Sequence, residues 1–119
     1  MEQAIIEGVR LFNTRHYFEA HEALEAVWLQ TTGPRKTFLH GVIQVAAAFH
    51  HHSRRNAAGF RSLLEKGSSK LEPFGAEVEG IDVPDFMAQL QVWLEHLNEP
   101  SLPAPPLPQI RFVTEPQCG

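Results

Sequence analysis

Side chains that can bind metals or transfer protons gather in one short stretch, YFEAHEALEAVW, which spans residues 17–28. Within it, His21 and Glu25 are four residues apart, and Glu22 and Glu25 are three apart. On a helix, these spacings place the side chains next to one another. A histidine and a glutamate so placed can bind the same divalent metal ion. The stretch therefore predicts either a polar binding site or a charged helix edge.

The run HEALE, residues 21–25, is similar to the H-E-x-x-H pattern of zinc peptidases, but Glu25 stands where the second histidine belongs. Zinc peptidase chemistry needs both histidines, so we do not assign it. Di-iron bundles use an E-x-x-H pair, whereas Glu22 and Glu25 form only E-x-x-E. A different divalent metal site stays open as a cofactor hypothesis, with His21, Glu22, Glu25 and His50 as its ligands.

A second group of histidines lies at residues 40 and 50–52. Three consecutive helical residues point in three directions, so residues 50–52 cannot chelate one metal ion together. His40 and His51 are about 16 Å apart along a helix axis, which is too far to share an ion. His50 points toward the apolar side of its helix, so we expect it to be partly buried. A buried imidazole needs a partner, and a carboxylate from residues 21–25 would supply one.

Hydrophobic periodicity predicts five helices that position these residues. They span about residues 2–13, 16–30, 35–55 and 57–72, and the fifth begins after Asp82. Asn56 and Asp82 are suitable N-cap residues, and the Gly33–Pro34 pair separates the second helix from the third. The third helix has the widest apolar arc, so we expect it to be central. The fold class is therefore all-α, with sequential helices packed antiparallel in an up-and-down bundle.

The second helix should bury one face and leave its acidic residues along an edge. The expected core residues are Tyr17, Ala20, Leu24, Val27 and Trp28. His21, Glu22 and Glu25 lie at the margin of that face, and Glu19 lies on the far side. A tight antiparallel connection brings residues 21–25 alongside residues 40–50. A neighbouring helix could therefore cover the margin.

We divide the chain into a bundle domain, residues 1–99, and a proline-rich extended tail, residues 100–119. Proline cannot sit inside a helix, but the tail also holds apolar residues, which a disordered segment usually lacks. We expect order from about Leu102 to Phe112, across the bundle or a partner subunit. A free P-x-x-P ligand is the alternative. Residues 73–84 read as a loop, and only residues 110–114 have strand-like alternation.

The bulk composition excludes several classes of function. A net charge of −4 gives no general attraction to nucleic acid or to an anionic membrane. The longest apolar run, residues 45–49, is too short to span a bilayer, and the N-terminus lacks the pattern of a signal peptide. Cys118 is the single cysteine, so no internal disulfide can form. These features predict a soluble cytoplasmic protein. The sequence also has no serine in the glycine-framed turn that presents the nucleophile of many hydrolases.

The sequence from Tyr17 to His51 resembles the domain-of-unknown-function family 309, a group of small prokaryotic proteins. The resemblance covers about residues 8–72 and rests on an aromatic residue, E-x-H-E-x-L-E-x-x-W, a glycine turn and G-x-I-Q-x-A-x-x-x-H. The pattern falls on Glu19, His21, Glu22, Glu25, Trp28, Gly41, Gln44 and His50. It implies three core helices with a left-handed twist plus flanking helices. No activity comes with the resemblance, and the tail lies outside it.

Three hypotheses for function follow from these residues. The first is a pocket between the second and third helices that binds a metal ion or small ligand, with or without catalysis. Its candidate residues are Glu19, His21, Glu22, Glu25, Trp28, Gln44 and His50. The second is an interaction module that binds a protein partner, or a second copy, through its groove or tail. The third is a polar seam that only fixes helix packing.

Overall fold

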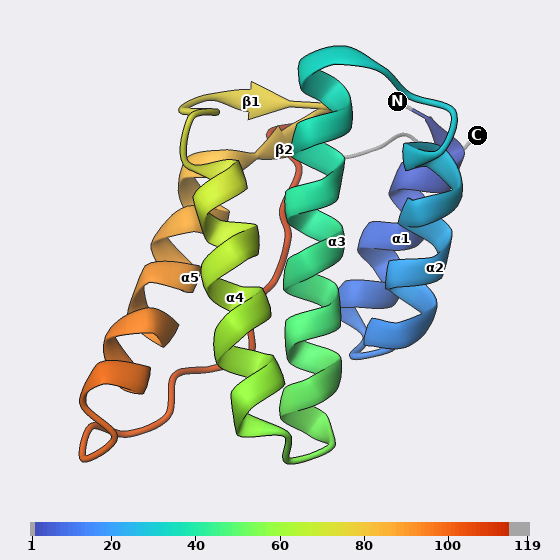
Figure 1. Ribbon diagram of the computed structural model, residues 1–119. Helices are drawn as coiled ribbons and strands as arrows, with labels where there is room; N and C mark the ends of the chain where they lie inside the picture. Colours follow the sequence, from blue (N-terminus) through green and yellow to red (C-terminus); the bar gives the residue numbers. More distant parts are fainter. Residues whose placement is uncertain (1, 115–119) are drawn as a thin grey trace.

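The computed structural model describes residues 2–114, in which four helices pack around a central fifth helix. Figure 1 shows α3 in the middle, with α1 and α2 on one side and α4 and α5 on the other. The bounds are α1 Gln3–Asn13, α2 Tyr17–Trp28, α3 Gly33–Ser53, α4 Ala57–Leu71 and α5 Val83–Asn98. The predicted all-α bundle is confirmed. Within residues 2–114, no helix has the length and apolar character needed to cross a membrane.

Local signals in the sequence account for where two of the helices begin. The Asn56 side chain accepts a hydrogen bond from the Gly59 amide at 3.0 Å, and Asp82 accepts one from Asp85 at 3.1 Å. Each bond satisfies a backbone N–H group that has no partner within its helix. Both predicted N-caps are therefore confirmed. Pro34 lies in the first turn of α3, where its missing N–H group costs no hydrogen bond.

The apolar arc of α3 makes it the core of the bundle, as predicted. Its buried apolar side chains include Phe38, Leu39, Val42, Ile43, Val45, Ala46 and Phe49. The ring of Phe49 has no exposed surface and meets aromatic rings from α1, α4 and α5. Centroid distances are 6.4 Å to Phe12, 5.1 Å to Phe60 and 5.3 Å to Trp93. One side chain thus joins four helices through edge-on aromatic contacts.

The closest approach between α3 and α4 depends on two glycines. A Cβ atom added at Gly67 would lie 2.8 Å from the Gly41 carbonyl oxygen and 2.8 Å from a Val45 methyl group. Real Cβ atoms do not tolerate such contacts, so a larger residue would force the helices apart. Gly41 belongs to the motif found in the sequence, and the close contact between α3 and α4 explains why a glycine stands at this position.

The connection at residues 73–84 is not a plain loop, which corrects the sequence-based prediction. It contains a hairpin of β1, Glu77–Val78, and β2, Ile81–Asp82. Glu79 and Gly80 have φ angles of 55° and 78°, the conformation of a two-residue type I′ turn. The Arg35 side chain forms an ion pair with Glu79 and anchors the turn to α3. Strands of two residues are too short for alternation to reveal them.

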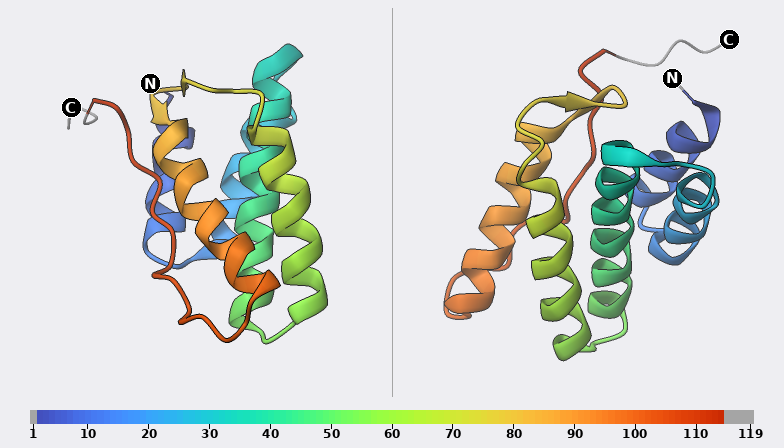
Figure 2. Two further views of the ribbon diagram at one scale, coloured as in Figure 1. Left: turned by 90° about the vertical axis from the view of Figure 1, so that its left-hand side faces the viewer. Right: turned by 45° about the horizontal axis from the view of Figure 1, so that its top comes forward.

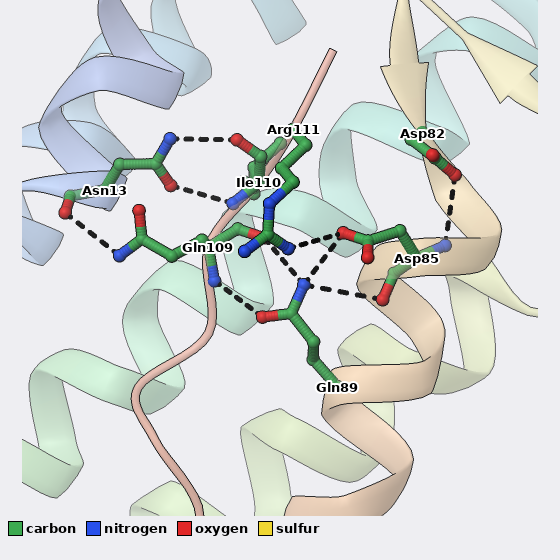
Figure 3. A network of polar contacts seen from close by, with 7 residues as sticks. All are labelled: Asn13, Asp82, Asp85, Gln89, Gln109, Ile110 and Arg111. Carbon is green, nitrogen blue, oxygen red and sulfur yellow. Dashed lines mark hydrogen bonds and ion pairs between the residues drawn. The ribbon is translucent and has the colours of Figure 1, made fainter. Parts of the chain in front are cut away.

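The proline-rich tail is docked along the bundle from Pro106 to Phe112, which confirms the later part of the predicted segment, whereas Leu102 is exposed. Figure 3 shows the Asn13 side chain paired with the backbone of Ile110 through two bonds of 2.8 Å each. Gln89 binds the backbone of Gln109 in the same way, at 2.8 and 2.9 Å. The tail thereby connects α1 with α5, and both views in Figure 2 show it running beside α5.

Two further contacts hold the ends of the docked segment. The Trp93 indole donates a hydrogen bond to the Pro106 carbonyl at 2.9 Å. Phe112 forms a single antiparallel bridge with Ile81, so the strand-like character expected at residues 110–114 is limited to this bridge. Cys118 lies outside the described residues.

Candidate ligand-binding groove

A hollow of about 220 Å³ lies between α2 and α3, where the sequence predicted a site. His21, Glu25 and Trp28 line it from α2, on successive turns of one helix edge. His40, Gln44 and Ala47 line it from α3, and Leu63 of α4 closes it. Four of the predicted site residues, His21, Glu25, Trp28 and Gln44, therefore share one hollow.

Two further hollows continue this one along the same helix pair. One of about 300 Å³ shares His21 and Ala47 with it and adds Phe18, His50 and His51. The other, of about 230 Å³, shares Trp28 and His40 and adds Gly33, Lys36, Thr37 and Lys70. Because neighbouring hollows share lining residues, we treat the three as one feature, the α2–α3 groove.

His21 and Glu25 face each other along the α2 edge of the groove. The distance from His21 Nε2 to the nearer Glu25 oxygen is 3.5 Å, and the two side chains are 28% and 48% exposed. The other ring nitrogen, Nδ1, is buried and has no hydrogen-bond partner among the described residues. An unpaired buried N–H group costs more than an unpaired lone pair. The favoured neutral tautomer therefore carries its proton on Nε2, toward Glu25.

Trp28 and His40 form the aromatic wall of the groove. Their ring centroids are 5.4 Å apart, and the Lys36 ammonium lies 4.5 Å from the centroid of the Trp28 ring. Burial, and then the charge of nearby Lys70, lower the pKa of His40 below its ordinary value of 6.5. The imidazole is therefore neutral at pH 7, and the ammonium groups carry the positive charge of this end.

Gln44 connects the groove to α4. Its side-chain oxygen accepts a hydrogen bond from Lys70 Nζ at 2.9 Å. The bond holds the Lys70 ammonium beside Trp28 and His40, which line the same hollow. Because the Gln44 oxygen already has a partner, its amide nitrogen is the group that remains able to donate.

The remaining predicted site residues lie differently. Glu19 and Glu22 are exposed and line none of the three hollows. Trp28, expected in the core, is only half-buried because one side of its ring faces the groove. His50 is half-buried, but its ring packs against Phe18 at 5.4 Å between centroids. The expected carboxylate partner of His50 is replaced by this aromatic contact.

The four residues considered as metal ligands are not gathered at one point. His21 and Glu25 form a pair, His50 lies in the adjoining hollow and Glu22 is exposed. Across residues 2–114, no cluster of three or more histidine, cysteine, aspartate or glutamate side chains is arranged to hold a metal ion. Among the described residues, these four side chains therefore do not form a single metal site.

Sequence reasoning missed several groove residues. His40 is four residues before Gln44, one turn away on the same helix face, so its spacing was a usable signal. Lys36 is one turn before His40 on α3 and could have been added by the same rule. Lys70 comes from α4, and no spacing within α2 or α3 points to it.

Comparisons with known proteins agree with the family resemblance that the sequence motif indicates. Residues 5–63 match the family described as Domain of unknown function (DUF309). This part of the chain belongs to that family. The matched residues include every α2 and α3 residue of the groove, while Lys70 lies beyond them.

A curated relative carries the similarity further along the chain. Uncharacterized protein YpuF of Bacillus subtilis (strain 168) is 34% identical over 93 residues, which is 76% of this chain. The match covers 53% of YpuF, so this chain spans about half the length of that relative. The similarity supports the shared fold and assigns no activity.

Proposed function

We propose that the α2–α3 groove binds a small organic anion with a planar body. One observation carries the proposal: side chains from three helices converge on the groove and differ in chemistry along its length. The end between α2 and α4 holds two ammonium groups, Lys36 and Lys70, beside an aromatic wall. The middle holds hydrogen-bonding groups from His21, Glu25 and Gln44.

The charges at the lysine end favour an anion. The residues that line this hollow include two ammonium groups and no carboxylate. His40 adds a neutral imidazole there at pH 7, since burial lowers its pKa. Charges of one sign in a concave site concentrate ligands of the opposite sign. Glu25 lies in the adjoining hollow, so it would act on the uncharged part of the ligand.

The aromatic wall favours a planar body next to the anionic group. The rings of Trp28 and His40 lie 5.4 Å apart and line both the lysine hollow and the middle hollow. Such rings give a flat ligand a large contact area at a small entropic cost. The Gln44 amide nitrogen and the His21–Glu25 pair then provide donors and acceptors that select the polar edge of the ligand.

The proposal can be tested with three probes that separate its parts. Adenosine monophosphate has both a planar body and an anionic group, adenosine lacks the anion, and inorganic phosphate lacks the planar body. Calorimetric titration should give the tightest binding for adenosine monophosphate. Lys70→Gln should weaken that binding about tenfold, the effect of losing one charge-assisted hydrogen bond.

Lys66 supplies the matched control. It lies on the same helix as Lys70, is exposed and lines none of the three hollows. Lys66→Gln should therefore leave binding unchanged. If none of the probes binds and Lys70→Gln only lowers the melting temperature, the groove is a packing seam, as the third hypothesis holds. Equal weakening by both variants would mean that overall charge, rather than the groove, attracts the anion.

A further inference from the structure

A second hollow lies on the other side of α3, where the end of α3, the start of α4 and the end of α5 meet. Its volume is about 390 Å³, which is within the range of about 300–1,000 Å³ usual for small-molecule sites. The lining residues are His52, Arg55, Asn56, Ala57, Phe60, Trp93, His96 and Leu97. It shares none of them with the α2–α3 groove, and we call it the α3–α5 cavity.

Aromatic rings form the walls of the α3–α5 cavity. The centroid of the His52 ring lies 4.8 Å from that of Phe60 and 5.2 Å from that of Trp93. His96 packs edge-on against Trp93 at 5.8 Å. The Trp93 indole also donates a hydrogen bond to the Pro106 carbonyl of the docked tail. The walls therefore present aromatic faces and edges that suit a flat ring.

The charged and polar groups of the cavity favour a negative charge. Arg55 provides a guanidinium group, two imidazoles provide N–H donors, and no carboxylate lines the cavity. His96 Nδ1 is buried without a partner among the described residues, so the favoured tautomer carries its proton on Nε2. A guanidinium group binds a planar carboxylate through two parallel hydrogen bonds.

Arg55 occupies a backbone position that a smaller residue would fill at lower cost. Its φ angle is 60°, in the left-handed region, directly after the end of α3. Glycine or asparagine is usual at this position of a helix C-terminus. Arginine in this left-handed conformation costs conformational energy, which glycine would avoid. The Arg55 side chain lines the cavity.

We propose that the α3–α5 cavity binds a planar aromatic monocarboxylate, with the ring between His52, Phe60 and Trp93 and the carboxylate on Arg55. The guanidinium group neutralises the carboxylate, and the imidazole N–H groups add hydrogen bonds. This cavity is separate from the α2–α3 groove, so either binding proposal can fail without the other.

The test titrates benzoate into the full-length protein, with isotope-labelled histidine and tryptophan side chains followed by NMR. Saturable shifts are expected at His52, His96 and Trp93. Benzamide has the same ring without the charge and should bind at least about tenfold more weakly, as expected for one lost charge-assisted interaction. Shifts confined to His21 and His40, or no saturation below about 10 mM benzoate, would overturn the proposal.

Arg55→Gly tests the anion contact without unfolding the protein, because glycine relieves the backbone conformation. It should weaken benzoate binding at least about tenfold while the melting temperature stays the same or rises. Arg15→Gly is the matched control, since Arg15 has a φ angle of 68° after α1 and does not line the cavity. Lys70→Gln should also leave benzoate binding unchanged. Unchanged benzoate affinity in Arg55→Gly would refute the assignment.

Discussion

The ring centroids of Phe18 and His50 lie 5.4 Å apart, so the start of α2 meets the end of α3 through an aromatic contact. No ion pair of His50 accompanies it among the described residues, and the carboxylate of Glu25 faces His21. The contact decides what His50 contributes to stability: it fills space and does not hold a buried charge.

His50→Leu should therefore change the free energy of unfolding by less than about 1 kcal/mol, as for most partly exposed positions. A stranded carboxylate partner would instead cost about 3–5 kcal/mol. Urea denaturation followed by circular dichroism measures the difference. Phe49→Ala, which empties the centre of the core, is the positive control and should cost about 3–5 kcal/mol. A comparable loss in His50→Leu would show that a carboxylate does bind this histidine.

Gly67→Ala should destabilise the protein, although alanine favours helices. The gain in helix propensity is about 1 kcal/mol, but the added methyl group would meet the Gly41 carbonyl oxygen at 2.8 Å. Overpacking of this kind costs about 1–3 kcal/mol, so the net effect is a lower melting temperature. Gly75→Ala is the matched control, because a Cβ atom there meets nothing within 4 Å. Equal melting temperatures for the two variants would contradict the close approach of α3 and α4.

Asn13→Ala should loosen the docked tail. Both hydrogen bonds to the Ile110 backbone are lost, and Ile110 is only 2% exposed, so its N–H and C=O groups would lack partners. The expected cost is about 1–3 kcal/mol, measured by thermal and urea denaturation. Asn98→Ala changes the same residue type at an exposed position at the end of α5 and should have little effect.

Removal of the tail after Glu99 extends this prediction. It uncovers Ile81 and the Trp93 indole, which the tail contacts, so the melting temperature should fall by more than in Asn13→Ala. Binding of a dye that fluoresces on apolar surfaces should increase. A shortened protein with unchanged melting would show that the tail contributes nothing to the bundle.

The parts of the structure that depend on local sequence could be predicted. The five helices follow from apolar spacing, and Asn56 and Asp82 mark helix starts because a cap acts within three residues. The hairpin at Glu79 and Gly80 was missed because its turn lacks the usual Asn-Gly signal and its strands are very short.

The site was predictable only in part, because its geometry depends on how far each helix edge is covered. Spacing on α2 grouped His21 with Glu22, but a rotation of about 100° per residue turns Glu22 out to solvent. Lys70 reaches the groove from α4 through Gln44, a contact between residues 26 positions apart. Such long-range contacts leave no periodic signal in the sequence.

The dependence of the free energy of unfolding on pH should reveal the lowered pKa of His40. Burial, then Lys70, lower its pKa in the folded protein, while the unfolded chain keeps the ordinary value of 6.5. Between these two pKa values the unfolded chain binds more protons, so the free energy of unfolding must decrease as the pH falls below about 7. The decrease stops below the folded-state pKa, and one histidine contributes at most about 1.4 kcal/mol per pH unit.

His40→Gln removes this titration and should flatten the profile between pH 7 and pH 5. Urea denaturation at half-unit pH steps, compared with the unchanged protein, isolates the contribution of His40 from that of the carboxylates.

His52, whose pKa is lowered by burial and then by His96, supplies an independent second contribution to the pH dependence of stability. His52→Gln should flatten the profile further when combined with His40→Gln, because the two rings line different hollows. If the profile of His40→Gln runs parallel to that of the unchanged protein, His40 is as open to water as an ordinary surface histidine. The aromatic wall of the groove would then not be closed against solvent.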